Sequence, residues 1–279
     1  MFKILLKENL VPNLQVVKIE APEIAKKALP GQFVIIRVDE YGERIPMTIA
    51  EADPEEGIIT VIFMEVGTTT GKMASLKTGD YIENFTGPLG IPTEIENVGT
   101  VLCIGGCYGI GGITPIAKAM KEAGNKVISI IEGRSKRLLY WQDKLEEACD
   151  ELVTVSGDDS DSYQEWISEK IDRYIKGNDK PDLVIAIGCT FMMRNVAEAT
   201  RDEGIKTIVH LSPIMVDGTG MCGCCRVEVG GTTKFACVDG PEFDAHEVEW
   251  DLLLARQVQY LAEEVESLQM FECTNWTKV

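Results

Sequence analysis

The stretch that decides the fold is TVLCIGGCYGIGGITPIAKAM, residues 100–120. It begins as an apolar run of strand length, passes through a glycine-rich loop and continues as a helical pattern. Because the loop joins a strand to a helix start, its backbone amides and the helix dipole are placed to receive a pyrophosphate. The glycine spacing differs from the G-x-G-x-x-G fingerprint, and many α/β loops contain several glycines. The stretch therefore predicts an α/β domain more firmly than it predicts a ligand.

Strands and helices alternate after this unit. The predicted strands are KVISIIEG (126–133), ELVTVSG (151–157), DLVIAIG (182–188) and KTIVHLS (206–212), and the predicted helices lie around 138–148, 163–176 and 191–204. Such alternation is typical of a doubly wound parallel sheet that is covered by helices on both faces. We assign residues 98–211 to this domain.

Residues 1–97 have a different pattern, with short strands separated by Gly, Pro and acidic turns. The candidate strands are QVVKIE (15–20), QFVIIRV (32–38), IPMTIA (45–50), IITVIFMEV (58–66) and YIENFTG (81–87). They are rich in β-branched residues, and only 22–29 has a helical pattern. The region predicts a small antiparallel β-barrel.

The composition excludes several classes of protein. A chain of 279 residues suffices for two compact units and a small appendage. Its net charge of −18 argues against nucleic-acid and anionic-membrane binding, which need basic surface. The start MFKILLKENL does not resemble a signal peptide, and no apolar run is long enough to span a bilayer. With nine cysteines and no export signal, we expect reduced thiols, metal ligands and a cytoplasmic location.

Residues 212–279 form a third unit, with a Gly/Cys-rich part at 212–243. DGTGMCGCC (217–225) holds Asp217, Cys222 and Cys225, and Cys237 follows after a predicted hairpin. With cysteine in place of the aspartate, the spacing would be that of a plant-type [2Fe–2S] loop. Glycines let such a loop wrap closely and aim amides at cluster sulfurs, and a carboxylate oxygen can ligate iron. We therefore predict a [2Fe–2S] cluster held by Asp217, Cys222, Cys225 and Cys237.

Other interpretations of the cysteines stay open. Zinc accepts a Cys3Asp set, although structural zinc sites usually show paired Cys/His knuckles. A redox disulfide between Cys222 and Cys225 would leave Cys237 without a role. Cys224 is the alternative fourth ligand, but its spacing breaks the pattern. We expect the remaining cysteines to be small buried residues.

The tail from about residue 244 carries a helical stripe of apolar residues. Its members are Val248, Leu252, Ala255, Val258, Leu261, Ala262 and Val265. We expect this stripe to pack on the protein's own domains, and docking on a partner is the alternative.

Several motifs together resemble the ferredoxin–NADP⁺ reductase superfamily. They are RIPMTI (44–49), GTTTGKMASLKTGDYIENFTGPLG (67–90), GGCYGIGGITPIAKAM (105–120), and CGCCRV (222–227) followed by FACVDGPEFDAHEVEWD (235–251). The order of barrel, nucleotide domain and cluster tail is similar to that of two kinds of electron-transfer subunit. One serves dihydroorotate dehydrogenase, and the other, which is more similar, serves NADH-dependent reduced ferredoxin:NADP⁺ oxidoreductase. The resemblance covers essentially the whole chain.

The resemblance implies FAD in the barrel, NAD(H) in the second domain and a [2Fe–2S] cluster near the flavin. By motif, Thr48 would hydrogen-bond the reactive edge of the flavin ring and is the predicted catalytic residue. The other cofactor-binding positions it implies are Pro46, Met47, Phe63, Met64 and Glu65 around the flavin, Thr69 and Thr70 at its diphosphate, and Gly109, Ile110 and Gly111 at the nicotinamide dinucleotide.

Three further positions either depart from the family's motifs or have a second interpretation. Arg44 stands one place too early for the family's Arg-x-Tyr-Ser motif, yet it is kept as a diphosphate ligand. Arg134, after the second strand of the α/β domain, is placed near a nucleotide ribose or phosphate, and a solvated surface arginine is an equal interpretation. Cys189 falls where the family has the proline of Cys-Gly-Pro, and we do not assign it a catalytic role.

The predicted function is electron transfer: NAD(H) exchanges hydride with FAD, and single electrons pass through the cluster to or from a larger partner. The resemblance implies a glutamate-synthase-like flavin and iron–sulfur partner, and through it ferredoxin and NADP(H). One rival is the dihydroorotate dehydrogenase subunit, for which cysteine is expected at position 217. Another is a non-catalytic module that senses redox state or nucleotide. The preference between NAD and NADP stays open, because Arg134 would also suit the 2′-phosphate of NADP.

Overall fold

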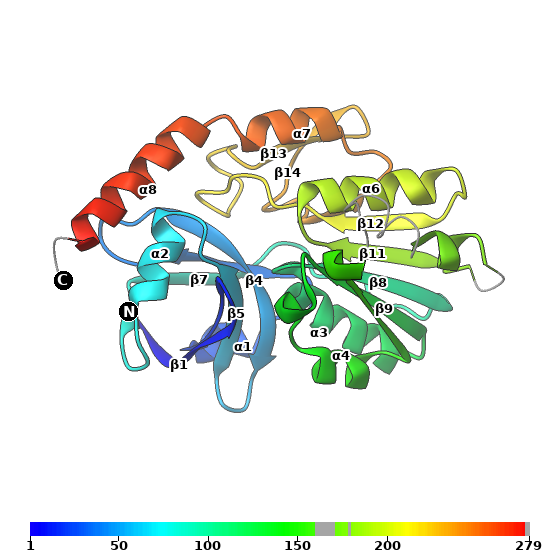
Figure 1. The fold of residues 1–279 in the computed structure, drawn as a ribbon, viewed down its shortest axis with the longest axis horizontal. Coiled ribbons are helices and arrows are strands. Elements are labelled where there is room, and N and C mark those ends of the chain that lie inside the picture. Colours follow the sequence, from blue (N-terminus) through cyan, green and yellow to red (C-terminus); the bar gives the residue numbers. More distant parts are fainter. Residues whose placement is uncertain (160–170, 178–179, 277–279) are drawn as a thin grey trace.

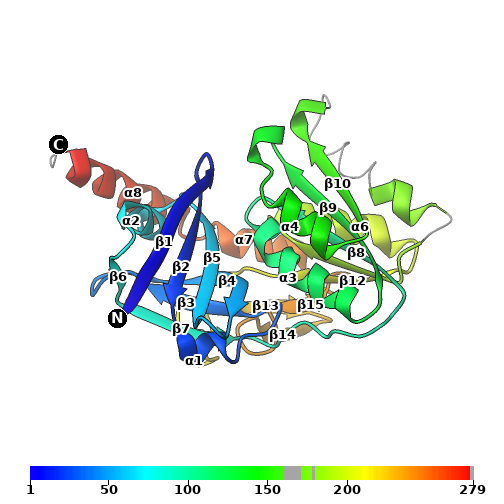
Figure 2. The same cartoon turned by 90° about the horizontal axis from the view of Figure 1, so that it is seen from below.

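The computed structural model describes residues 1–159, 171–177 and 180–276. Two large sheets lie side by side, and the C-terminal helices cross above both of them (Figure 1). Seen from below, the barrel and the α/β unit are two separate lobes that meet near β4 and α3 (Figure 2). Within the described ranges, no helix combines the length and the apolar character needed to cross a membrane.

The first sheet is an almost closed antiparallel barrel. Its strands are β1 (Phe2–Val11), β2 (Leu14–Glu20), β3 (Phe33–Arg37), β4 (Arg44–Asp53), β5 (Ile58–Met64), β6 (Tyr81–Ile82) and β7 (Asn84–Leu89), in the order β6-β1-β2-β5-β4-β3-β7. The predicted barrel is confirmed. Its core, which includes Ile19, Ile36 and Phe63, comes from residues that alternate along the strands.

Two elements of this unit differ from the prediction. β1 was not expected, because only Ile4 of its ten residues is fully buried and the strand shows no apolar alternation. Only 22–29 was expected to be helical in this unit, but residues 68–75 also form a helix, α2 (Thr68–Ser75). The Thr70 hydroxyl accepts the backbone N–H of Gly67 at 3.0 Å and caps this helix. The predicted helix at 22–29 is one turn, α1 (Pro22–Ala25).

The second sheet is parallel and doubly wound, as predicted. It contains β8 (Thr100–Gly106), β9 (Lys126–Gly133), β10 (Glu151–Ser156), β11 (Leu183–Ile187) and β12 (Lys206–His210), with the order β10-β9-β8-β11-β12. Helices α3 (Gly109–Glu122) and α4 (Gln142–Ala148) belong to the core on one face, and α6 (Thr190–Arg201) to the core on the other. Short 3₁₀ turns lie at Lys136–Leu138 and Gly157–Asp159. The helix expected at 163–176 lies mostly outside the described residues.

The cysteine-rich segment joins this sheet. Its hairpin, β13 (Arg226–Val229) and β14 (Thr232–Phe235), turns at Gly230 and Gly231, whose φ angles are 58° and 70°. The predicted hairpin is therefore confirmed. The sequence did not predict β15 (Glu242–Asp244), which pairs antiparallel with β12 and extends the sheet. The third unit is thus anchored on the α/β unit through backbone pairing.

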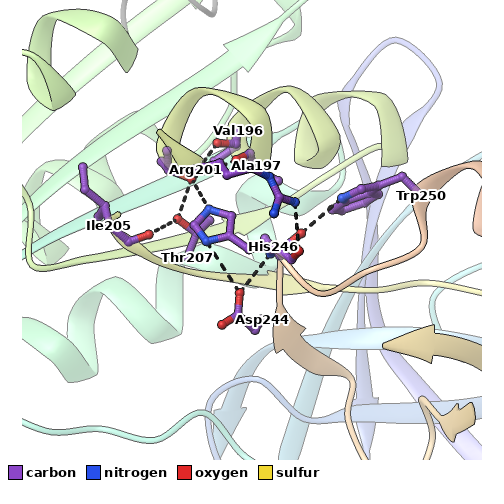
Figure 3. A network of polar contacts seen from close by, with 10 residues as sticks. Val196, Ala197, Arg201, Ile205, Thr207, Asp244, His246 and Trp250 are labelled. Carbon is purple, nitrogen blue, oxygen red and sulfur yellow. Dashed lines mark hydrogen bonds and ion pairs between the residues drawn. The ribbon is translucent and has the colours of Figure 1, made fainter. Parts of the chain in front are cut away.

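A polar network strengthens this anchor (Figure 3). The Arg201 guanidinium on α6 donates to the carbonyl of His246 at 2.8 Å, and the His246 imidazole contacts the Thr200 hydroxyl at 2.9 Å. Thr200 in turn accepts the hydroxyl of Thr207, on β12, at 2.7 Å. The Trp250 indole N–H donates to the carbonyl of Ala245 at 3.1 Å. Helix α6 and strand β12 therefore hold the segment that follows β15.

The tail forms α7 (Trp250–Gln257) and α8 (Leu261–Trp276). The expectation that its apolar stripe packs on the protein's own domains is wrong for most of the stripe. Val248 is buried, but Leu252, Val258, Leu261 and Val265 are exposed. The chain turns at 258–260, and this break moves the second half of the stripe away from the first. Helix α8 instead lies along α2 of the barrel (Figure 1).

Candidate functional site

A cavity of about 200 Å³ lies between the barrel and the α/β unit. The barrel contributes Phe33, Pro46, Met47, Thr48, Ala50, Ile62, Phe63, Met64, Val66 and Thr70, and the rest of the chain contributes Tyr108, Gly112, His210, Leu211, Ser212, Met215 and Pro241. Two-domain interfaces are a common place for cofactor sites. This cavity is the candidate flavin site.

The barrel wall of the cavity holds most of the positions that the family motif implies. Pro46, Met47 and Thr48 come from β4, and Phe63 and Met64 from β5. Helix α3 approaches this wall at Gly112, where an added Cβ would lie 3.0 Å from the Thr48 methyl. The absence of a side chain at position 112 lets the α/β unit close against the predicted catalytic residue.

The threonines of α2 are partly engaged by the protein itself. The Thr69 hydroxyl donates to Glu43 at 3.1 Å, and the Thr70 hydroxyl donates to the carbonyl of Gly67 at 3.0 Å. The first-turn amides of a helix have no partner within the helix. An anion at this position would therefore meet backbone amides more readily than hydroxyls. Glu65 is exposed and accepts the Gln15 amide at 3.3 Å, outside the cavity lining.

The glycine loop after β8 is packed and internally bonded. A Cβ on Gly109 would lie 2.0 Å from the carbonyl oxygen of Ile187, and the Ile110 side chain is fully buried. The backbone N–H of Gly111 donates to the Tyr140 hydroxyl at 3.0 Å. The glycines therefore allow close packing of α3 on β11, and direct contact of residues 109–111 with a nucleotide stays a prediction.

A second, more open hollow of about 500 Å³ lies at the carboxyl ends of β8 and β11. It is lined by Tyr108, Cys189, Thr190, Phe191, Ser212, Leu254, Ala255, Gln257 and Val258. The strand order reverses between β8 and β11, and ligands of doubly wound sheets bind at such a point. Tyr108 and Ser212 line both hollows, so a ligand in the second would approach one in the first.

Helix α7 closes one side of this second hollow. The Gln257 side chain accepts the Thr190 hydroxyl at 2.8 Å and donates to the carbonyl of Ser212 at 3.2 Å. Arg134 is exposed after β9, and its charge partly offsets the burial that raises the pKa of Cys107 to about 11. Arg134 therefore lies near the loop that begins α3, and its contact with a nucleotide stays a prediction.

The predicted cluster loop brings two of its cysteines into contact. The Cys225 and Cys237 sulfurs are 3.2 Å apart and buried, while Cys222 is exposed. Burial and the contact with Cys225 raise the pKa of Cys237 to about 12. The backbone N–H of Cys224 lowers the pKa of Cys222, with a further contribution from the N–H of Asp217. None of the nine cysteines, all of which lie in the described ranges, forms a disulfide.

Asp217 lies beside Cys222 on the rim of this loop. Its carboxylate accepts the Thr219 hydroxyl at 2.5 Å and the backbone N–H groups of Thr219 and Met221 at 2.9 and 3.2 Å. These hydrogen bonds lower the pKa of Asp217, and the charge of Arg44 lowers it further. Arg44 is thus placed near the cysteine loop, so its predicted role as a diphosphate ligand stays a proposal.

The loop fits an iron–sulfur cluster in its donors and its backbone. Glycines 218, 220 and 223 have φ angles of 82°, 84° and 68°, which allow the tight wrap. A hydrogen bond from the N–H of Gly220 partly offsets the raised pKa of Cys237, and hydrogen bonds to sulfur are typical of iron–sulfur sites. Among the described side chains, no three His, Cys, Asp or Glu already form a closed metal site. Metal binding is coupled to folding of its site, and the exposed Cys222 as a ligand stays a prediction.

The sequence analysis missed the wall that the α/β unit contributes. Tyr108, His210, Ser212 and Met215 line the cavity but belong to no motif of the barrel. The one available signal was position, because Tyr108 and His210 stand at the carboxyl ends of parallel strands, where ligands bind.

Fold and cavity together define a class of protein. An antiparallel barrel beside a doubly wound sheet is the architecture of ferredoxin-reductase-like flavoproteins. A cytochrome P450 reductase from Amycolatopsis, GcoB, shares it with a TM-score of 0.61 and 19% identity, over 73% of this chain and 66% of its own. That likeness shows the fold alone.

More similar relatives identify the family. The chain is 46% identical over 253 residues, 91% of its length and 89% of the relative's, to the dihydroorotate dehydrogenase B (NAD(+)) electron transfer subunit homolog of Thermotoga maritima. Residues 212–249 match the iron–sulfur cluster binding domain of dihydroorotate dehydrogenase B. The chain belongs to the family of dihydroorotate dehydrogenase B electron-transfer subunits and their homologs.

A solved structure agrees with this assignment. It comes from work on flavin-based electron bifurcation in the NADH-dependent reduced ferredoxin-NADP oxidoreductase. It matches with a TM-score of 0.91 and 43% identity, over 97% of this chain and 98% of that one. The fold and the matched domain imply FAD, NAD(H) and an iron–sulfur cluster as cofactors.

Proposed function

We propose that the chain is an electron-transfer subunit that exchanges hydride between NAD(H) and FAD. It then passes single electrons through a [2Fe–2S] cluster to or from a larger partner. The flavin ring of FAD would occupy the 200 Å³ cavity, and the nicotinamide would enter from the second hollow. The cluster would be held by Asp217, Cys222, Cys225 and Cys237.

One observation carries this proposal: the cavity and the cysteine loop lie next to each other along the chain. Met215 lines the cavity, and Asp217 follows two residues later. Two residues span at most about 7 Å between their Cα atoms. A Cβ on Gly218 would lie 2.8 Å from Ile35 of β3, so the loop also packs on the barrel. Ligands in the cavity and on the loop would therefore be close enough for electron transfer.

The cofactors supply the hydride and single-electron chemistry when bound, and the protein supplies binding and orientation. The Thr48 hydroxyl provides a hydrogen-bonding group in the barrel wall, beside Pro46, Met47 and the buried Phe63. These apolar neighbours exclude water, which strengthens a hydrogen bond made in the cavity. Gln257 bridges Thr190 and Ser212 beside the second hollow and fixes the wall on which the nicotinamide would enter.

NADH oxidation tests the catalytic part of the proposal. The purified protein with both cofactors bound is expected to oxidise NADH with an artificial one-electron acceptor, without any partner. Thr48→Val, which removes only the hydroxyl, is expected to slow flavin reduction about tenfold or more, the loss of roughly one hydrogen bond. Thr233→Val on the exposed strand β14 is the control and should not change the rate. A protein that holds both cofactors but leaves NADH unoxidised would instead support the sensing module.

For the partner, we propose a larger flavin and iron–sulfur protein of the glutamate-synthase type, through which ferredoxin and NADP(H) are reached. Any electron bifurcation would then belong to the complex. The name of the Thermotoga relative favours a second candidate, the dihydroorotate dehydrogenase subunit. Asp217 at the first ligand position favours the first candidate. Affinity purification from the source cells separates the two, because the partner would be either the glutamate-synthase-like protein or the dehydrogenase.

A further inference from the structure

The α/β wall of the cavity carries a histidine with no assigned role. His210 is the last residue of β12, is 5% exposed and lines the cavity opposite the barrel strands. Its Nδ1 atom is buried and has no hydrogen-bond partner among the described residues. Most buried polar side-chain atoms are hydrogen-bonded, and one without a partner is unfavourable for the folded protein. No hydrogen bond to the described part of the protein therefore fixes the orientation of this ring at the cavity wall.

Polar groups next to His210 are engaged elsewhere. The Ser212 hydroxyl lies 3.3 Å from the Tyr108 hydroxyl, and the Ser212 carbonyl accepts Gln257. Glu242, which faces His210 in the register of β12 and β15, accepts the Thr93 hydroxyl at 2.5 Å. The imidazole therefore faces a largely apolar cavity without being committed to a protein partner.

Burial also determines the form of the ring. It lowers the pKa of His210 to about 4, so the imidazole is neutral near pH 7. A neutral imidazole has one N–H donor and one acceptor nitrogen, and its two tautomers exchange these roles. The flavin ring presents acceptors along its edge when oxidised and an additional N–H when reduced. A neutral histidine can complement either form without bringing a charge into the cavity.

We propose that His210 is a flavin-binding residue that hydrogen-bonds the bound flavin from the α/β side of the cavity. The inference rests on the proposed function, because it takes FAD as the occupant. It makes the flavin site a joint product of both units: β4 and β5 supply one wall, and the end of β12 supplies a hydrogen-bonding group on the other. FAD would thereby hold the two units together.

The test measures FAD binding to the apoprotein by the change in flavin fluorescence. His210→Phe keeps a ring of similar size but removes both nitrogens, and we expect the dissociation constant to rise about tenfold. The visible spectrum of the bound flavin should change as well. His210→Asn and His210→Gln place an amide near the positions of Nδ1 and Nε2, so at least one of them should restore most of the affinity. His246→Phe removes the chain's other imidazole, which does not line the cavity, and should leave FAD affinity unchanged.

The possible outcomes are distinct. Wild-type affinity in His210→Phe would overturn the inference, and His210→Leu provides the same test if the phenylalanine variant does not fold. If FAD binds weakly to all four variants of His210, with Phe, Leu, Asn or Gln in its place, the residue has a packing role. That result would also overturn the inference. A wild-type chain that binds no FAD would contradict the proposed function itself, before any variant is compared.

Discussion

Asp217→Ala is expected to lose most of the iron–sulfur absorption of the purified protein, while Cys224→Ser retains it. The alanine removes a predicted ligand. It also removes the carboxylate that accepts three hydrogen bonds from Thr219 and Met221. Substitutions of residues that only support ligands typically cost 10–100-fold in metal affinity, so loss of a ligand should cost at least about tenfold. Iron and sulfide per chain, measured after anaerobic purification, check this.

The comparison with Cys224 makes the result specific. Its thiol lies in the same loop. Burial raises the pKa of this thiol, and its hydrogen bond with Cys222 raises the pKa further. Its carbonyl accepts the Arg256 guanidinium at 3.1 Å, a contact that the serine variant keeps. Full iron content in Asp217→Ala together with a colourless Cys224→Ser would mean that the fourth ligand is sulfur. Asp217→Cys should hold a cluster with a changed spectrum if position 217 is a ligand.

Gly109→Ala is expected to lower the free energy of unfolding by about 3 kcal/mol, at the upper end for overpacking. The new Cβ would meet the Ile187 carbonyl oxygen at 2.0 Å and the Gly188 nitrogen at 2.9 Å. Both belong to backbone at the carboxyl end of β11, so the methyl group has no flexible neighbour to displace. The melting temperature should fall by about 10 °C, at about 2–4 °C per kcal/mol for a large domain.

Gly67→Ala is the matched control, because an added Cβ there meets nothing within 4 Å and the φ angle of −156° suits any residue. It should cost about 1 kcal/mol at most, the usual cost of a poorer helix cap. If Gly109→Ala melts like the wild type and only NADH binding weakens, the loop serves as a nucleotide cradle first and a packing contact second. That result would support the interpretation of the glycine motif as a pyrophosphate-binding loop.

The sequence predicted the large elements because their patterns are local. The run from Val101 to Gly106 is apolar throughout, as expected for a strand with both faces covered, and the barrel strands alternate. β1 was not predicted because few of its side chains are buried, so its sequence shows no strand pattern. Its pairing with β2 and β6 makes it a strand. β15 is three residues long, and only its pairing with β12 makes it a strand.

The candidate site divides in the same way. Thr48 and Phe63 belong to strands whose motif the sequence displays, and the structure places both in the cavity. His210 and Tyr108 come from another unit, and only tertiary packing brings them opposite the barrel. The bonding of Gly111 to Tyr140, 29 residues away, also depends on packing, so the glycine pattern alone could not separate a phosphate cradle from a packed turn.

The central claim is that this polypeptide binds a flavin and a [2Fe–2S] cluster next to each other. Its most direct test is the visible spectrum of anaerobically purified protein, with chemical analysis for flavin, iron and acid-labile sulfide. About one flavin, two irons and two sulfides per chain are expected from one FAD and one [2Fe–2S] cluster. Protein that stays colourless after FAD, iron and sulfide have been supplied under anaerobic conditions would contradict the account.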